Sequence, residues 1–462
     1  MRRPNIIFIL LDDLGWRDLT CYGSPFYETP NLDRLATQGM RFTDAYAACP
    51  VCSPTRASLL TGKYPATLGL TDWIDWGLAC HPRQGRLVDV PYIKQLPLSE
   101  YSLARALRDG GYATWHVGKW HLGTRGFYPT DHGFDVNIGG CEWGMPCKGY
   151  WSPWQIPTLP DAPPGTYLTD HLTDQAIELI RQHAGSPQPF FLNLWHHAVH
   201  TPIQAPPTLV EKYKAKAQRL GLDKQPALEV GEPMPYVNPD NRHIIRRRIQ
   251  SDPVYAAMIE NLDTNIGRLL EVADKDTIVI FTSDNGGLAT AEGSPTTNQP
   301  LAEGKGWMYE GGTREPFLVK WPGVTQPGAI SEVPITSPDL YPTILEMAGL
   351  PPLPHQHVDG TSFVPALRGA TQHNRAPLFW HYPHYGNQGG TPGSSIRQGD
   401  WKLIEFFEDG RLELYNLCDD IGEEHNLAAK QPIVTRRLHE QLVAWRTSIE
   451  AKIPQRNSDR KE

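Results

Sequence analysis

Cys52 begins a short stretch, C-S-P-T-R (52–56), that leads directly into the helix-like segment ASLLTG. A cysteine in such a place can be a buried thiol, one half of a redox pair, a metal ligand or a catalytic nucleophile. Its immediate neighbours leave all four interpretations open, so other parts of the chain have to distinguish between them.

Two adjacent carboxylates, Asp12 and Asp13, form a second group that could do chemistry. They follow the apolar run from 5 to 11 without a break. Such a run predicts a buried strand, and carboxylates at its end are costly unless positive charge compensates them. A bound metal ion is the simplest compensation.

Spacing disfavours three other kinds of cysteine site. Cys49 and Cys52 form a C-x-x-C pair, but a thioredoxin-like unit needs a strand before it, and the preceding segment is a weak strand. A zinc site needs a second suitably spaced pair of ligands, which Cys141 and Cys147 do not supply. A cysteine phosphatase needs a longer interval between cysteine and arginine than the three residues between Cys52 and Arg56.

Histidines and lysines elsewhere are ambiguous when taken singly. His196, His197 and His200 follow a strand-like segment and lack the glutamate of a zinc-binding H-E-x-x-H helix. A histidine at a strand end is often a hydrogen-bonded structural residue, and Lys119 and Lys305 taken alone would be surface charges. Their meaning depends on whether the fold brings them together.

Four segments share one design, an apolar β-rich run followed at once by polar residues. They are 5–15, 112–123, 190–202 and 277–287. Helical patterns lie between them, at 32–40, 102–111, 173–185 and 254–273. This alternation predicts an α/β fold with a large, mostly parallel central sheet flanked by helices on both faces.

Ligands of such sheets bind beyond the carboxyl ends of the strands. We therefore expect the polar residues at which these runs end to converge on one edge of the sheet. They are Asp12, Asp13, Lys119, His121, His200, Asp284 and Asn285.

The pattern changes past about residue 370. Residues 394–417 predict antiparallel strands with a hairpin turn at Asp409-Gly410, and a helix is predicted around 435–451. We expect a larger α/β domain and a smaller C-terminal α+β subdomain that contains an antiparallel sheet, with bounds 1–370 and 371–462. Two regions, 141–165 and 204–250, are expected to be surface loops that wall a pocket.

Composition narrows the possible partners and location. The 462-residue chain has a net charge of -8, which argues against nucleic-acid binding, and its one basic run, Arg246 to Arg248, is expected to be a solvated helix face. No segment is apolar over the roughly 20 residues of a membrane span, so no membrane partner is expected. The chain as given lacks a signal-peptide pattern and its seven cysteines fit a reducing compartment, which predicts a cytoplasmic protein, or an exported one if a leader was trimmed.

A set of motifs runs in order through nearly the whole chain. They are DDLGW (12–16), TPNLDRLATQGMRF (29–42), CSPTRASLLTG (52–62), GYATWHVGKWHLG (111–123), HTP (200–202), TSDNGG (282–287), GKGWMYEGGTREP (304–316), RQGDWKLI (397–404) and LYNLCDDIGEEHNLA (414–428). Together they resemble the type I sulfatases of the alkaline phosphatase superfamily, in particular bacterial carbohydrate sulfatases. Thr55 stands where many members have serine, a small departure because the family's modification signal requires the cysteine, proline and arginine.

The resemblance implies a modified nucleophile at Cys52. In that family a maturation enzyme oxidises the cysteine to formylglycine, and the aldehyde is hydrated to a geminal diol. One diol oxygen attacks sulfur, and the other hydroxyl expels sulfate when it is deprotonated, which regenerates the aldehyde. By resemblance, Arg56 holds the diol and offsets the carboxylates of the metal site.

A calcium ion is the implied cofactor. The ligands implied by the resemblance supply only oxygen atoms, which select a hard cation, and additional sulfate and diol oxygens suit Ca²⁺ better than a strictly octahedral Mg²⁺. These ligands are Asp12, Asp13, Asp284 and Asn285.

The resemblance also assigns the surrounding cations. Lys119, His200 and Lys305 are expected to bind the sulfate, and His200 with Lys305 to protonate the leaving-group oxygen. His121 is expected to take a proton during elimination, and Asp284 to help ionise the attacking hydroxyl.

The implied reaction is hydrolysis of sulfate monoesters, with an exo-acting carbohydrate sulfatase for galactose- or N-acetylgalactosamine-type sulfates as the finer expectation. The substrate would be a small sulfated saccharide, read by loops at 69–98, 137–165 and 381–395. The enzymatic alternative is a phosphodiesterase or phosphonate monoester hydrolase of the same superfamily. A non-enzymatic sugar-sulfate binding protein with an unconverted Cys52 is a third hypothesis, which no sequence feature favours.

Overall fold

The computed structural model describes residues 3–76, 83–238, 240–372 and 375–459. Four parallel strands occupy the middle of its central sheet in the order β8, β1, β5, β3. Each corresponds to one of the predicted apolar runs: β1 Ile6–Leu11, β3 Ala113–Gly118, β5 Phe190–Trp195 and β8 Ile278–Ser283. The predicted mostly parallel α/β sheet is confirmed.

Five further strands complete the nine-stranded sheet. β9 (Arg314–Lys320) runs antiparallel to both of its neighbours, β8 and β2 (Met40–Tyr46). β10 (Ala329–Ser331) and β11 (Ile335–Thr336) pair with β2, and β4 (Val136–Ile138) pairs with β3. The antiparallel β9 makes the sheet mixed.

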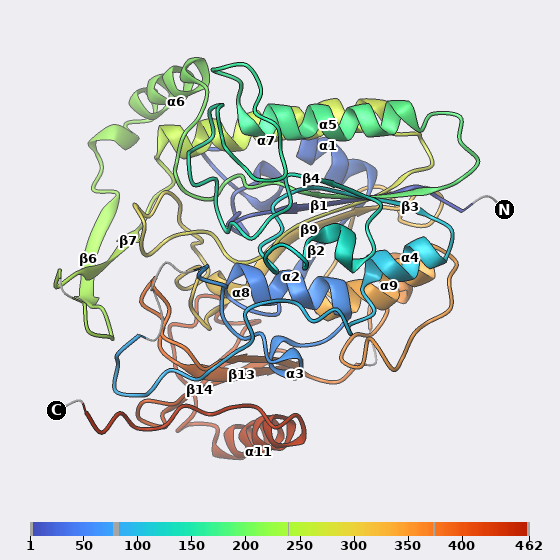
Figure 1. Cartoon of the computed structure of the whole chain (residues 1–462). Helices are drawn as coiled ribbons and strands as arrows, with labels where there is room; N and C mark the ends of the chain where they lie inside the picture. Colours follow the sequence, from blue (N-terminus) through green and yellow to red (C-terminus); the bar gives the residue numbers. More distant parts are fainter. Residues whose placement is uncertain (1–2, 77–82, 239, 373–374, 460–462) are drawn as a thin grey trace.

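Helices cover both faces of this sheet (Figure 1). One face carries α1 (Pro30–Gln38), α5 (Leu168–Gln182) and α7 (Pro253–Val272). The opposite face carries α2, α4 and α9, whose bounds are Cys52–Thr61, Leu103–Asp109 and Leu340–Met347. The four helical patterns seen in the sequence correspond to α1, α4, α5 and α7.

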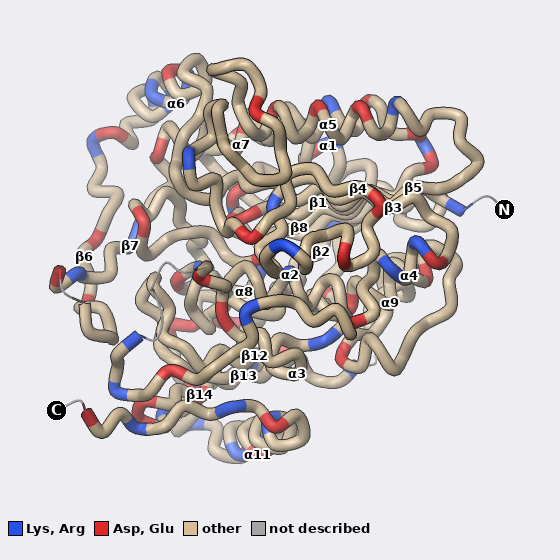
Figure 2. The backbone as a smooth tube through the Cα atoms, viewed as in Figure 1, with Lys and Arg blue, Asp and Glu red and all other residues tan. Residues whose placement is uncertain are grey.

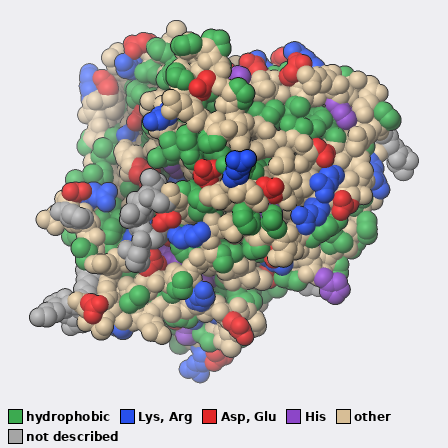
Figure 3. Space-filling model, viewed as in Figure 1, with side chains coloured by type: hydrophobic (Ala, Val, Ile, Leu, Met, Phe, Trp, Pro, Cys, Tyr) green, Lys and Arg blue, Asp and Glu red, His purple; other side chains and the backbone are tan. Residues whose placement is uncertain are grey.

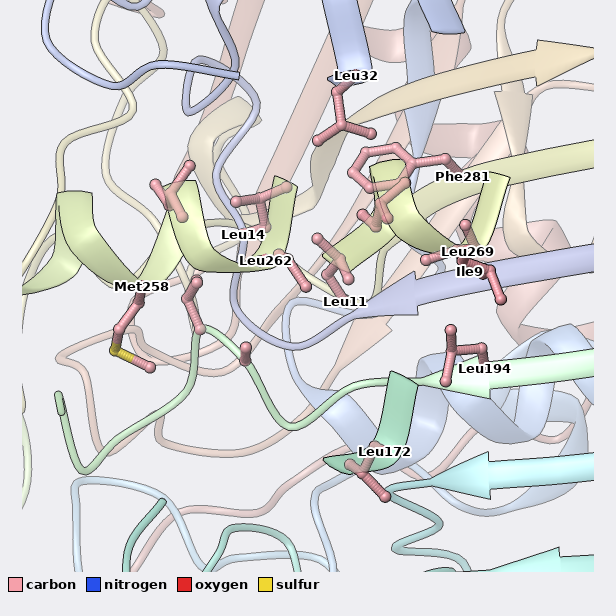
Figure 4. Packing of buried hydrophobic residues seen from close by; sticks show 14 of the residues in the cluster. Ile9, Leu11, Leu14, Leu32, Leu172, Leu194, Met258, Leu262, Leu269 and Phe281 are labelled. Atoms are coloured by element: carbon pink, nitrogen blue, oxygen red, sulfur yellow. The ribbon is translucent and has the colours of Figure 1, made fainter. Parts of the chain in front are cut away.

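Alternate residues of β1 enter two different cores. Ile7, Ile9 and Leu11 pack in the cluster under α1, α5 and α7, part of which is shown in Figure 4, whereas Ile6 and Phe8 join the cluster on the α2 side. A strand covered on both faces needs apolar residues at every position, which is why the run is continuous. Burial of each such side chain stabilises the folded state by roughly 1.5–3 kcal/mol. The central strands therefore hold the residues that follow them in fixed positions.

The C-terminal part forms a four-stranded antiparallel sheet. Its strands are β12 (Leu378–Tyr382), β13 (Gly393–Gln398), β14 (Trp401–Phe406) and β15 (Leu412–Asn416). The predicted Asp409-Gly410 turn lies between β14 and β15, and α11 (Pro432–Ser448) packs on the sheet at the bottom of Figure 1. β12 was not expected from the sequence. The domain bounds 1–370 and 371–462 stay a prediction.

A buried ion-pair cluster joins this sheet to the larger domain. Lys402 of β14 lies 2.9 Å from carboxylate oxygens of both Glu310 and Glu423, and Arg314 lies 3.1 Å from Glu310. Glu310 begins the short helix α8 (Glu310–Thr313). Breaking a buried pair by removing one partner costs about 3–5 kcal/mol, so the cluster couples the two parts of the chain.

The region 204–250 differs from the expected loop. It contains α6 (Pro207–Arg219) and a hairpin of β6 (Leu228–Pro233) with β7 (His243–Arg247), visible at the left edge of Figure 1. The basic run Arg246 to Arg248 is likewise not a helix face, because β7 carries its first two residues. Arg246 pairs with Glu232 and Glu303, and Arg248 pairs with Glu229, so local ion pairs stabilise the hairpin where the polar sequence suggested no element.

The remaining helices are short. They are α3 (Pro65–Leu68), α10 (Val364–Leu367) and the 3-10 helices η1 (Thr20–Tyr22), η2 (Pro129–His132), η3 (Leu222–Lys224) and η4 (Ser337–Asp339). No helix in the described part of the chain is both long and apolar enough to cross a membrane. Lysine and arginine are interspersed with aspartate and glutamate along the chain and on the face shown (Figures 2 and 3).

Candidate active site

The polar residues after the four parallel strands meet at one edge of the sheet. Lys119, which follows β3, donates a 2.6 Å hydrogen bond from Nζ to Asp12, which follows β1. Asp284, which follows β8, accepts the backbone N–H of Asp13 at 3.3 Å. The register of neighbouring parallel strands places their carboxyl ends side by side, so residues hundreds of positions apart become neighbours.

Cys52 approaches this edge as the first residue of α2. Arg56 lies four residues later and therefore shares its helix face with Cys52. The Arg56 guanidinium donates from Nε to Asp284 at 2.8 Å and from Nη1 to the Lys119 carbonyl at 3.3 Å. Its Nη2 lies 2.7 Å from Asp284 and 3.7 Å from Asp12, so one buried cation links the helix to two strand ends.

Lys305 supplies another cation from the loop before α8. Its ammonium group lies 2.8 Å from the Asp13 carboxylate and 3.0 Å from His200 Nε2. Asn285 donates to the same carboxylate at 2.8 Å. Asp13 itself has a positive φ of 64°, a conformation rare outside glycine, so the chain bends sharply where the carboxylate is presented.

Three carboxylates, Asp12, Asp13 and Asp284, are thus enclosed with Arg56, Lys119 and Lys305. Burial by itself favours the neutral form of Asp12, but the nearby cations, Lys119 above all, outweigh burial and hold its pKa below the usual range. The cluster is electrically balanced, which is what permits so many charges to be buried together.

Burial has the opposite result for two other groups. It raises the pKa of Asp284 above its ordinary value in spite of the opposing charge of Arg56. It also raises the pKa of the Cys52 thiol to about 12, although Lys119 and Lys305 lie nearby. An unmodified Cys52 would therefore be a neutral thiol at pH 7, and the thiolate is the nucleophilic form.

The oxygen atoms at this edge fit a hard cation. Asp12 Oδ1 and Asn285 Oδ1 are buried and have no hydrogen-bond partner within the described residues. Ligand atoms of Asp12, Asp13, Cys52 and His200 all lie within 4.8 Å of one another. Buried acceptors without donors are costly, and a cation held by oxygen ligands satisfies them.

His121 presents its ring from the loop after β3. Its Nε2 lies 2.8 Å from the Ile74 carbonyl, an acceptor, so this nitrogen carries the proton. Burial, reinforced by the charge of Lys119, lowers the pKa of His121 well below its ordinary value, which keeps the ring neutral. Nδ1 then has a free lone pair, and it has no hydrogen-bond partner in the described part of the structure.

A cavity of about 370 Å³ opens over these residues. Four of the predicted site residues, Cys52, His121, His200 and Lys305, are buried and line this cavity, and we call this part its base. The other six do not line it: Asp12, Asp13, Arg56, Lys119, Asp284 and Asn285. Its remaining walls carry three tryptophans, Trp73, Trp76 and Trp143. Indole rings of this kind suit stacking on the apolar faces of a sugar.

The three predicted sugar-reading loops all contribute to these walls. Residues 73–76 come from the loop 69–98, residues 142–147 from 137–165, and Asn387 with Gln388 from 381–395. Residues 77–82 of the first loop lie outside the described residues. The loop 141–165 thus walls the pocket, as expected.

Sequence reasoning did not single out two residues at this site. Glu292 lines the cavity from a segment without a recognisable motif, and nothing in its neighbours signals a role. Trp195 ends β5 and places its ring 5.1 Å from the Arg56 guanidinium carbon, a cation–π contact. A large aromatic residue at the last position of a buried strand was the available signal for Trp195.

Comparison with known proteins identifies the family. The family model described as Sulfatase matches residues 4–350, about three quarters of the chain. The chain belongs to the sulfatase family. A second model, N-sulphoglucosamine sulphohydrolase, C-terminal, matches residues 303–448 of this sulfatase.

Two curated relatives extend the similarity over most of the sulfatase. A sulfatase from Formosa agariphila is 32% identical over 96% of this chain and 89% of its own length. The N-acetylgalactosamine-6-sulfatase of Homo sapiens is 33% identical over 82% of this chain and 68% of its own. The sulfatase is therefore an enzyme whose reaction is the hydrolysis of sulfate esters.

A solved structure supports the same assignment. The crystal structure of Ps i-CgsB has a TM-score of 0.75 and 28% identity to this sulfatase, over 96% of this chain and 92% of that one. That protein has also been solved in complex with k-i-k-neocarrahexaose. The predicted type I sulfatase resemblance and alkaline phosphatase-like fold are confirmed.

Arg56 tests whether the linkage between α2 and the strand ends matters for catalysis. Arg56→Lys keeps the charge but removes the second donor to Asp284, and we expect kcat on an aryl sulfate to fall by about 10²-fold. Arg248→Lys, on the exposed hairpin, is the matched control and should retain wild-type activity. Circular dichroism would show that both variants are folded, and a folded Arg56→Lys variant with wild-type kcat would contradict this account.

Proposed function

We propose that this sulfatase uses a formylglycine made from Cys52, together with Ca²⁺, to remove sulfate from a carbohydrate. The observation that carries the proposal is the grouping of Cys52 with Asp12, Asp13 and His200, whose ligand atoms lie within 4.8 Å of one another. Lys119 and Lys305 flank this group through their 2.6 and 2.8 Å contacts to the aspartates. A sulfate ester at Cys52 would meet the positive charge that its transition state requires.

The formylglycine, when hydrated, supplies a hydroxyl nucleophile and a second hydroxyl that allows sulfate to be released by elimination. The chain's own residues hold this side chain in place. Arg56, fixed by Asp284 and by the ring of Trp195, positions the start of α2 against the strand ends. The N-terminus of α2 also directs the positive end of the helix dipole toward the negative charge of the ester.

Two histidines are placed for proton transfer. His200 Nε2 lies 3.0 Å from Lys305 Nζ, and both side chains line the cavity, so they can protonate the oxygen of the departing alcohol. His121 has the free Nδ1 lone pair described above and also lines the cavity, which suits it to accept the proton of the second hydroxyl. Asp284, held by Arg56, is the residue that we assign to assist ionisation of the attacking hydroxyl.

Ca²⁺ would be held by Asp12, Asp13, Asp284 and Asn285. When bound, it would polarise the sulfate and favour ionisation of the hydroxyl. The buried Oδ1 atoms of Asp12 and Asn285, which accept no hydrogen bond from the described residues, support this set of ligands. Lys119 and Lys305, which contact Asp12 and Asp13 directly, would lie beside the metal and supply positive charge to the sulfate.

The substrate we propose is the end of a saccharide that carries sulfate on galactose or N-acetylgalactosamine. The three tryptophans of the cavity provide stacking surfaces, and Asn387 and Gln388 provide hydrogen-bonding groups. A cavity of about 370 Å³ with walls from three loops favours a chain end over the interior of a polymer. The relationship to an N-acetylgalactosamine-6-sulfatase supports this sugar type.

A maturation enzyme must reach Cys52 before the fold is complete. Cys52 is 3% exposed, and Pro54 and Arg56 of the modification signal are also buried in α2. The signal can therefore be read only from a chain that is still unfolded around residues 49–62. We propose this enzyme as a transient partner during synthesis.

Substrate comparison tests the reaction and the sugar. For protein produced with a maturation enzyme, we expect kcat/KM for an aryl sulfate to exceed that for a phosphodiester or phosphonate monoester by roughly 10²-fold or more. Among saccharides, terminal sulfated galactose or N-acetylgalactosamine should be desulfated in preference to glucose-configured sulfates and to internal residues. A clear phosphodiester preference would instead assign the chain to the alternative activity.

Mass spectrometry tests the nucleophile. The tryptic peptide from Phe42 to Arg56 should carry a CHO group in place of CH2SH in active protein. Across preparations made with different amounts of maturation enzyme, the apparent kcat should rise in proportion to the fraction of peptide that is converted. Fully active protein with an intact thiol would overturn the formylglycine assignment, and the Cys418-containing peptide provides an unmodified reference.

Chelation tests the metal. Dialysis against a calcium chelator should abolish turnover and lower Tm, because a ligand present at 100 times its Kd stabilises the folded state by about 2.7 kcal/mol. Ca²⁺ should restore both quantities at lower concentration than Mg²⁺. Asn285→Ala should weaken the Ca²⁺-dependent shift in Tm, and an unchanged Tm on addition of Ca²⁺ to the chelated wild type would count against the proposed ligands.

A further inference from the structure

The cavity above Cys52 is lined by groups of opposite charge. Lys305 and His200, which the proposed function assigns to the sulfate, are among its lining residues. Three acids, Asp75, Glu142 and Glu292, also line it. Among the described residues that line the cavity, Lys305 is the only lysine or arginine.

Glu292 is held in place by neutral groups. Its Oε1 accepts hydrogen bonds from Asn387 Nδ2 at 2.7 Å and from Gln388 Nε2 at 2.9 Å. Its Oε2 lies 3.5 Å from the Thr201 hydroxyl, next to His200. Two amides and a hydroxyl orient the carboxylate, and Lys305 interacts with its charge only at longer range, without a direct ion pair, so part of that charge acts on whatever occupies the cavity.

Glu142, which also lines the cavity, is held by a neutral group as well. Its Oε2 accepts a 2.6 Å hydrogen bond from the Tyr128 hydroxyl. Neither Glu142 nor Glu292 forms an ion pair within the described part of the chain. Asp75 differs, because Lys94 lies 3.3 Å from its carboxylate and offsets its charge.

We propose that Glu142 and Glu292 select the saccharide by charge, admitting a sugar with a single sulfate whose other substituents are neutral or cationic. Hydroxyl, N-acetyl and amino groups fit this environment, whereas a second sulfate or a carboxylate inside the cavity does not. This inference rests on the proposed function, because it takes the base of the cavity as the sulfate subsite.

Two physical effects act together. A second anionic group placed beside two carboxylates that form no direct ion pair is repelled, and like-charge contacts of this kind disfavour a ligand. The three indole rings add to this selection, because they stack on the apolar face of a sugar and offer an anion no donor other than the indole N–H. The same carboxylates can accept hydrogen bonds from sugar hydroxyls, so they do not weaken the binding of neutral sugars.

The test compares one sugar with one sulfate against the same sugar with two. In the wild type we expect kcat/KM for the monosulfated sugar to exceed that for the disulfated sugar by roughly 10²-fold at low salt, narrowing as ionic strength rises. Glu292→Gln and Glu142→Gln keep the shape and the acceptor oxygen while removing the charge. Each should reduce this ratio by about tenfold, and the double variant by more.

Glu211→Gln, on the exposed face of α6, is the matched control and should leave the ratio unchanged. Using a ratio removes any general change in turnover caused by the substitutions. A wild type that treats both sugars alike, or substitutions at both glutamates that leave the ratio unchanged, would overturn the inference. An aryl sulfate serves as the common reference. If converted protein hydrolyses the aryl sulfate but does not discriminate between the two sugars, only this inference is refuted. If converted protein hydrolyses no sulfate ester at all, the proposed function is refuted.

Discussion

The enclosure of three carboxylates with three cations at the carboxyl edge of the central sheet is the constraint on which this molecule depends. Asp12, Asp13 and Asp284 repel one another, and they remain buried together only because Arg56, Lys119 and Lys305 lie within contact. The parallel register of β8, β1, β5 and β3 brings these groups to one place. A charge lost here leaves its partner buried and unpaired, so the cluster that prepares the site for an anionic substrate also holds the strand ends together.

The position of Cys52 follows from the same arrangement. Arg56 ties α2 to two strand ends, and this leaves Cys52 at the start of the helix, facing the cations from below the cavity. The site is deeply buried, which strengthens electrostatic stabilisation of a sulfate ester but also keeps an ordinary thiol protonated. The same burial therefore disfavours an ionised, unmodified Cys52 as the nucleophile.

The C-terminal sheet contributes to the site through the loop that carries Lys305. This loop leads directly into α8, whose first residue, Glu310, pairs with Lys402 of β14 and with Arg314 of β9. Gln388, which precedes β13, contacts Glu292 at the rim of the cavity. The smaller part of the chain thus supports the loop of Lys305 and one wall of the cavity, so the site depends on both parts being docked.

The sequence by itself determined the four central parallel strands, their alternation with helices, and the residues expected at the sheet edge, because continuous apolar runs and terminal polar residues are local signals. It did not reveal β12, α6 or the β6–β7 hairpin, since the strand β12 is short and the polar hairpin is stabilised by ion pairs between its own strands. Only the tertiary structure decided that Trp195 lies against Arg56 and that Glu292 and Glu142 face one cavity. Such contacts join residues that are far apart in the chain, and their partners depend on how helices and loops pack over the sheet. An aromatic residue at a strand end signals Trp195 itself but not its partner Arg56.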